Sequence, residues 1–209
     1  MSIRVWFVLV GVVTLAGPTL TGCAKTTSHT SFVQHAPEKP TPPRSAPPVG
    51  ERVATVAAYT LDNWPRGFRN DCSGFVEATL SRVGIPLRGS TRMLWNAAKR
   101  FGWVHHRQFP RVGDLAFFDD TYDRNHNGRW DDELSHIAIV LDVDDDGTIV
   151  LAHAGTSAGR ARFVMNLFAP HDRYDEDGAR INDALRRGEG SNRATLAAEL
   201  LRGFASIRP

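Results

Sequence analysis

The chain has 209 residues and carries 25 Lys and Arg against 23 Asp and Glu, a formal net charge of +2. This balance, without a long basic block, does not predict binding to nucleic acid, so that class of function is set aside. The length allows one or two domains, and changes in composition along the chain have to indicate how much of it folds.

The first 22 residues have the pattern of an export signal. Arg4 supplies a positive charge, and residues 5–16 form an uncharged run that is too short to span a bilayer comfortably. The sequence Leu-Thr-Gly-Cys at residues 20–23 resembles the bacterial lipobox, which is cut before a cysteine that then receives acyl chains. We expect residues 1–22 to be removed and Cys23 to be lipidated. An ordinary signal peptide with a chance cysteine is the alternative.

Composition divides the rest of the chain into three parts. Residues 23–50 contain six prolines and few apolar residues, which predicts an extended tether behind the lipidated cysteine. Residues 51–168 can form one compact domain, which we expect to be monomeric. Residues 169–209 are a mostly charged extension with one predicted short helix, whose apolar stripe consists of Leu196, Leu200, Leu201 and Phe204.

Within residues 51–168, predicted helices precede predicted strands. Apolar spacing predicts a helix over residues 72–83, which Asn70 or Asp71 can cap, and a second helix over residues 91–100. Four short apolar runs predict buried strands, at residues 115–118, 137–141, 149–152 and 163–165. This order favours the α+β class, with N-terminal helices packed on an antiparallel β-sheet.

Cys72 is a candidate nucleophile. The chain has two cysteines, and lipidation of Cys23 would leave Cys72 as a lone thiol in an oxidising compartment. Its position at the start of a predicted helix is expected to lower the pKa of the thiol and to place backbone N–H groups near a developing oxyanion. A buried core cysteine is the alternative, but the neighbours Asp71 and Ser73 do not form an apolar pocket.

Two histidines are candidates for the base and its orienting partner. His136 begins one strand and His153 ends the next, with residues 144–147 as the hairpin turn. A hairpin loop of even length makes the numbers of paired residues sum to an odd value, which places His136 and His153 on the same face of the sheet. A nucleophile, a base and an orienting group are the minimum set for acyl transfer.

Four segments resemble, in order, the motifs of the NlpC/P60 family. These segments are Asp71 to Val76, Gly113 to Phe118, His136 to Val140, and His153 with Ala154. The family consists of papain-like hydrolases that cleave amide bonds in peptidoglycan stem peptides. The resemblance implies a papain-like fold and assigns the family's Cys, His and third polar residue to Cys72, His136 and His153. Tyr59 precedes the cysteine as a tyrosine does in the family, without the glycine pair that usually accompanies it.

The resemblance predicts a cell-wall endopeptidase with peptidoglycan as substrate, attached to a membrane through its lipid. Asp71, Ser73 and Tyr59 are the candidate substrate contacts. The related CHAP family of amidases and endopeptidases is the alternative, because residues 95–98, 136–140 and 146–149 also resemble its pattern, although its third residue is usually acidic or an amide. Two further alternatives are a zinc site formed by Cys72 and both histidines, and a module that binds peptidoglycan without cutting it.

One loop resembles a calcium-binding loop of the EF-hand type. Asp123, Asn125 and Asn127 occupy its first, third and fifth positions, and Gly128 follows. Leu134 stands where a bidentate Glu belongs, so Asp131, Asp132 or Glu133 would have to close the shell, and Asp131 and Glu133 are taken as the candidates. The thiol chemistry itself requires no cofactor, and a structural calcium ion is the one candidate. A solvated acidic turn is the alternative.

Overall fold

The computed structural model describes residues 46–156, 159–186 and 194–208. The predicted signal peptide, Cys23 and the tether as far as residue 45 therefore lie outside the described residues. Within them the elements are α1 (Val49–Asp62), α2 (Cys72–Arg82), α3 (Thr91–Arg100), β1 (Val104–His105), β2 (Leu115–Phe118), β3 (His136–Val143), β4 (Thr148–Thr156), β5 (Gly159–Asn166) and β6 (Leu201–Ala205). None of the helices in these ranges combines the length and the apolar character needed to cross a membrane.

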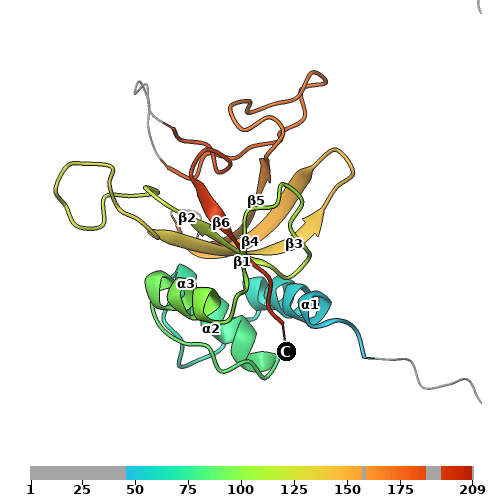
Figure 1. The fold of residues 1–209 in the computed structure, drawn as a ribbon, viewed down its shortest axis with the longest axis vertical. Coiled ribbons are helices and arrows are strands. Elements are labelled where there is room, and N and C mark those ends of the chain that lie inside the picture. Colours follow the sequence, from blue (N-terminus) through green and yellow to red (C-terminus); the bar gives the residue numbers. More distant parts are fainter. Residues whose placement is uncertain (1–45, 157–158, 187–193, 209) are drawn as a thin grey trace, which may run out of the picture. The chain divides into compact units, whose positions relative to one another are not determined.

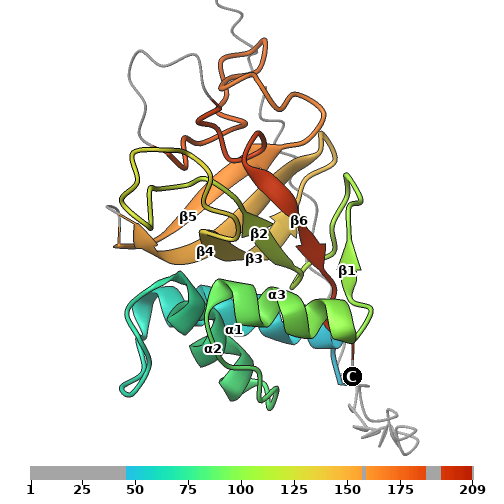
Figure 2. The ribbon, with the colours of Figure 1, turned by 60° about the vertical axis from the view of Figure 1, so that its left-hand side comes forward.

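The strands form one six-stranded antiparallel sheet, and the three helices lie on one of its faces (Figures 1 and 2). The strand order is β1-β6-β2-β3-β4-β5, so all neighbours from β2 to β5 are also consecutive in the chain. The predicted α+β architecture, with N-terminal helices packed on an antiparallel sheet, is confirmed. Helix α1, which the sequence analysis did not predict, begins within the segment assigned to the tether.

Both faces of the sheet are covered, which explains why its central strands are continuous apolar runs. On the helical side, Leu115 and Phe117 pack with Phe75 and Leu80 of α2. On the opposite side, alternate residues of the same strands pack under the segment that follows β5 (Figure 2), through Phe118, Phe163, Met165, Ala197, Leu200 and Phe204.

The prediction of a short helix in the tail was wrong. Residues 201–205 form strand β6, which pairs with β1 on one side and with β2 on the other. The apolar spacing yields only one turn, in which the N–H of Leu200 donates to the carbonyls of Leu196 and Ala197. The cause lies in the tertiary structure. Strand β2 is buried on both faces, and β6 supplies hydrogen-bond partners for the backbone groups along the free edge of β2. The sheet thus takes an internal strand from the predicted extension.

The β3–β4 hairpin positions both histidines on one face, as predicted, but by a different route. The turn comprises residues 144–147, with Gly147 at a φ of +84° and its N–H donating to the carbonyl of Asp144 at 3.0 Å. Next to the turn, Val143 pairs with Ile149, and the sum of these residue numbers is even. If this register continued along the strands, the histidines would lie on opposite faces of the sheet. A bulge between Val140 and Asp142 shifts the register, and the odd sum is restored before the strands reach the histidines.

Candidate functional site

The start of α2 is fixed by Asp71. Its carboxylate accepts hydrogen bonds from the backbone N–H of Gly74 at 2.6 Å and from the hydroxyl of Ser73 at 2.9 Å, so Asp71, rather than Asn70, is the cap. The side chain of Arg69 donates to the same Ser73 hydroxyl at 3.0 Å. Ser73 is 5% exposed. The structure therefore gives Ser73 an internal role in the cap, whereas the Asp71 side chain is also half exposed beside the thiol.

Cys72 is the first residue of α2 and is partly buried. The expectation of a lowered thiol pKa was wrong in direction. Burial raises the pKa of Cys72 above its usual value of 9.0, and the charge of Asp71 adds to this effect. Hydrogen bonds from Thr91 and from the backbone of Ile137 and Ser73 oppose the rise in pKa without reversing it. At neutral pH the resting sulfur is therefore a thiol, which needs a base to become a nucleophile.

The two histidines form a buried hydrogen-bonded pair. His136 Nε2 lies 2.9 Å from His153 Nδ1, and the two rings are nearly perpendicular, at 87°. Both residues are 4% exposed, and the His153 ring packs 4.5 Å from that of Phe163. Burial lowers the pKa of His136 from 6.5 to about 3, with a further contribution from His153, and lowers that of His153 to about 4. Both imidazoles are neutral at pH 7, so His136 can accept a proton.

The thiol lies beside the strand ends that carry these histidines. The backbone N–H that acts on the sulfur belongs to Ile137, the residue after His136. From the next strand, Gly155 approaches α2 so closely that an added Cβ would lie 2.9 Å from the backbone nitrogen of Cys72. Within the described ranges no hydrogen bond joins Cys72 to His136, whose Nδ1 is free of hydrogen bonds there. Catalytic hydrogen bonds often tighten only when substrate binds.

Tyr59, the third candidate substrate contact, does not lie at the thiol. The guanidinium of Arg82 stacks over its ring at 5.1 Å, and Arg82 is the last residue of α2 whereas Cys72 is the first. The two ends of this helix are about 15 Å apart at 1.5 Å per residue. Two residues that the sequence analysis missed lie nearer. Thr91 contacts the sulfur, and the charge of Cys72, together with burial, raises the pKa of Tyr122.

The buried histidine pair predicts a loss of stability in acid. Because the folded-state pKa of each histidine is below 6.5, the unfolded chain binds more protons at acidic pH, so stability is full above pH 6.5 and falls as the pH drops towards 4. We expect denaturant titrations to show a loss of about 1.4 kcal/mol per pH unit for each histidine, so up to about 2.7 kcal/mol per pH unit for the pair in this window. His153→Asn should make the slope shallower, whereas His126→Ala, at an exposed side chain, should not. Equal slopes in all three proteins would contradict the prediction.

The predicted calcium loop has part of the arrangement that the sequence suggested. The carboxylate of Asp123 accepts from the N–H of Gly128 at 2.8 Å, and the amide of Asn127 donates to Asp131 at 3.1 Å. The side-chain oxygen of Asn125 accepts from the N–H of Asn127 at 3.0 Å. Four of the five predicted ligands are therefore linked in one turn.

Glu133 is not part of this group. Its carboxylate lies 2.9 Å from the guanidinium of Arg202 and 3.6 Å from that of Arg92, so these ion pairs would have to break before it could close a calcium shell. Across the described ranges, no cluster of three or more His, Cys, Asp or Glu side chains is arranged to hold a metal. Two of the predicted calcium ligands are asparagines, which are not among these four residue types. Calcium binding at the loop therefore stays a prediction.

We expect calcium added to chelator-treated protein to raise the melting temperature. Binding stabilises the folded state by about 2.7 kcal/mol at a hundredfold excess over Kd, which corresponds to several degrees for a protein of this size. Asp123→Ala should erase the increase. Asp145→Ala, in the β3–β4 turn, is the matched control and should preserve it. A melting temperature that does not respond to calcium would leave a solvated acidic turn as the correct interpretation.

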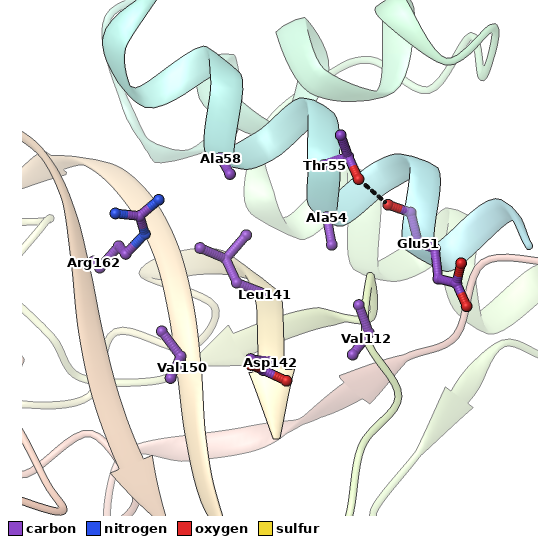
Figure 3. Close-up of a pocket in the computed structure, with 9 residues that line it drawn as sticks. All are labelled: Glu51, Ala54, Thr55, Ala58, Val112, Leu141, Asp142, Val150 and Arg162. Carbon is purple, nitrogen blue, oxygen red and sulfur yellow. Dashed lines mark hydrogen bonds between the residues drawn. The ribbon is translucent and has the colours of Figure 1, made fainter. Parts of the chain in front are cut away.

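A groove of about 490 Å³ lies elsewhere, between α1 and the sheet (Figure 3). Its charged lining residues are Glu51, Asp142 and Arg162, and its apolar ones include Leu141 and Val150. It contains neither Cys72 nor either of the paired histidines. The groove therefore lacks the groups needed for acyl transfer.

A partly buried thiol at a helix start, close to the backbone of the strand that begins with His136, and two hydrogen-bonded histidines are groups of the kind that thiol-dependent acyl transfer requires. The family model of the CHAP domain matches residues 62–155, a little under half of the chain, and this segment contains Cys72, His136 and His153. CHAP is the family that the sequence analysis gave as the alternative to NlpC/P60.

A solved structure from Staphylococcus aureus subsp. aureus Mu50, described as similar to a lipoprotein of the NLP/P60 family, is also similar to this chain. The two are 20% identical, with a TM-score of 0.38. The similarity covers 56% of this chain and 38% of the other. No curated protein matches the chain.

Proposed function

We propose that this protein is a cysteine hydrolase that cleaves amide bonds in the stem peptides of peptidoglycan. The observation that carries the proposal is the hydrogen bond of 2.9 Å between His136 and His153, together with the contact of the Cys72 sulfur with the backbone of Ile137, the residue after His136. The CHAP match supports it, because CHAP denotes cysteine- and histidine-dependent amidohydrolases and peptidases. A neutral imidazole has a nitrogen lone pair that can take the thiol proton, and the raised thiol pKa makes such a base necessary.

In the proposed mechanism His136 carries its proton on Nε2 and donates it in a hydrogen bond to Nδ1 of His153. This tautomer leaves Nδ1 of His136 to accept the proton of Cys72 as the sulfur attacks the carbonyl carbon. The imidazolium then protonates the leaving amine as the C–N bond breaks, and water hydrolyses the thioester that remains. His153 keeps the base in one tautomer and orientation.

The oxyanion that forms during attack needs hydrogen-bond donors. The first N–H groups of a helix have no backbone carbonyl of that helix to donate to, and in α2 these groups include the N–H of Cys72, Ser73 and Gly74. Asp71 uses one of them, since its carboxylate accepts from the N–H of Gly74. Within the described residues the N–H of Cys72 remains for the oxyanion, since that of Ser73 acts on the Cys72 sulfur, and the positive end of the helix dipole favours the negative charge there.

The test is digestion of purified peptidoglycan by the full chain, with mass spectrometry of the released fragments. Cleavage within the stem peptide gives peptide fragments shortened at an amide bond, whereas an amidase releases the whole stem from the glycan. The experiment is repeated with a zinc chelator, because loss of activity there would favour the zinc site. Sedimentation of the protein with peptidoglycan, without released fragments, would identify a binding module and refute the hydrolase.

We also propose that the chain is exported and anchored through lipid on Cys23. The basis is the lipobox resemblance at residues 20–23 and the proline-rich segment that separates Cys23 from α1. Cys23→Ser is expected to move the protein from the membrane fraction to the soluble fraction, while the activity of the released protein stays unchanged. The measurement is a fractionation of cells that express each variant. Equal amounts of both variants in the membrane fraction would contradict the anchor.

A further inference from the structure

The hydroxyl of Thr91 faces the sulfur of Cys72. The Oγ1 and Sγ atoms are 3.8 Å apart, a hydrogen-bond distance for sulfur, and Thr91 is 6% exposed. In the described part of the chain the sulfur is the only side-chain hydrogen-bond partner of this hydroxyl. Either atom can donate while the sulfur is a thiol. Once the sulfur is a thiolate only Thr91 can donate, and a hydrogen bond to an anion is the stronger one.

The position of Thr91 is set by α2 itself. Glu77 accepts a hydrogen bond from the N–H of Gly89, and Arg69 donates to the carbonyl of Gly89 at 2.9 Å. Arg69 and Glu77 are themselves joined by an ion pair of 3.1 Å. Both backbone groups of Gly89 are therefore held by side chains, one from just before α2 and one from the middle of α2. The hydroxyl of Ser90 then caps α3, which begins at Thr91.

The contacts of Arg69 and Glu77 with Gly89 bring the starts of α2 and α3 together at the sulfur of Cys72. Cys72 is the first residue of α2, and Thr91 is the first residue of α3. The first turn of each helix presents unpaired N–H groups and the positive end of its dipole, so both helices favour negative charge on the sulfur. Burial of the thiol acts in the opposite direction. The direct contact through the Thr91 hydroxyl is the part of this balance that a single substitution can remove.

We propose that Thr91 is a positioning residue, which donates a hydrogen bond to the Cys72 thiolate and holds the sulfur in place for attack. Its role in hydrolysis rests on the proposed function, but its effect on the thiol does not. The other groups around the sulfur are Asp71 and Tyr122, whose charged forms oppose the thiolate, and the Ile137 N–H, which favours it. His136, the base, precedes Ile137. None of these groups is altered by a substitution at Thr91.

The test measures the pH dependence of Cys72 alkylation by iodoacetamide in the full chain, with mass spectrometry to quantify the peptide that contains Cys72. Thr91→Val removes the hydroxyl and keeps the shape of the side chain, whereas Thr91→Ser keeps the hydroxyl. Loss of a hydrogen bond to the anion should raise the apparent pKa of alkylation by about one unit, a tenfold lower rate at a fixed pH below it. We expect this shift in Thr91→Val and a profile close to wild type in Thr91→Ser.

A Thr91→Val profile that coincides with wild type would overturn the proposal, and so would an equal shift in Thr91→Ser. If Thr91→Val does not fold, as judged by thermal melting, Thr91→Ala takes its place with the same expected shift. Hydrolysis is measured in parallel. If Cys72→Ala retained full hydrolysis, the proposed function would fail, whereas the alkylation shift would still decide the role of Thr91.

Discussion

Cys72→Ala is expected to lower the release of soluble peptidoglycan fragments by at least about a thousandfold, because no other group in the proposed mechanism can form the thioester. The fold should survive. Asp71 still caps α2 through the N–H of Gly74, and Ala is well tolerated in the first turn of a helix. The measurement pairs the initial rate of fragment release with the melting temperature, which should change by only a few degrees.

Cys23→Ser is the matched control for this substitution, since Cys23 is the other cysteine of the chain. It should leave the rate of the released protein unchanged. Undiminished activity in Cys72→Ala, with an unaltered melting temperature, would refute Cys72 as the nucleophile. The hydrolysis would then have to take place at a different site.

His136→Ala is expected to be nearly as damaging as Cys72→Ala, because it removes the group that takes the thiol proton. His153→Asn should retain a larger share of activity, about a tenth or more, because an amide oxygen can still accept the N–H of the His136 imidazole. The ranking rests on the proposed mechanism, in which His136 takes the proton and His153 holds His136 through the hydrogen bond of 2.9 Å. The measurement is kcat/KM for each variant, with His171→Ala as an exposed control.

The reverse ranking has a definite meaning. If His153→Asn were less active than His136→Ala while both proteins melted cooperatively, the two histidines would have exchanged roles. Equal, complete losses with intact folds would indicate that the pair acts as one unit and that orientation of the base is as necessary as its presence.

The helices near the thiol could be predicted because their signals are local. Asp71 and Ser90 are polar caps directly before α2 and α3, and apolar residues recur at helical spacing behind them. Strand β6 could not be predicted in this way. Its apolar residues fit a helical stripe equally well, and what decides is the free edge of β2, which belongs to a distant part of the chain.

The pairing of the two histidines was predicted, and the pKa of the candidate nucleophile was not. The residue types and the hairpin indicated that His136 and His153 share a face, although the bulge that makes this true leaves no clear mark in the sequence. The pKa of Cys72 was predicted in the wrong direction, because a helix start can be recognised from the sequence whereas burial of the sulfur depends on packing. Tyr59 was misplaced for a related reason, as the sequence does not reveal which end of α2 a neighbouring helix approaches.

The position of β6 also affects how the protein is made. This strand lies between β1 and β2, although β3, β4 and β5 all separate it from β2 along the chain. Pairs between distant segments form late, because closing a long loop costs chain entropy before any contact compensates for it. Until residues 201–205 have emerged, β1 and β2 lack their shared neighbour. A chain that is still being synthesised or translocated would therefore carry the thiol and both imidazoles on an incomplete sheet. The candidate site can form fully only after β6 has paired with β1 and β2.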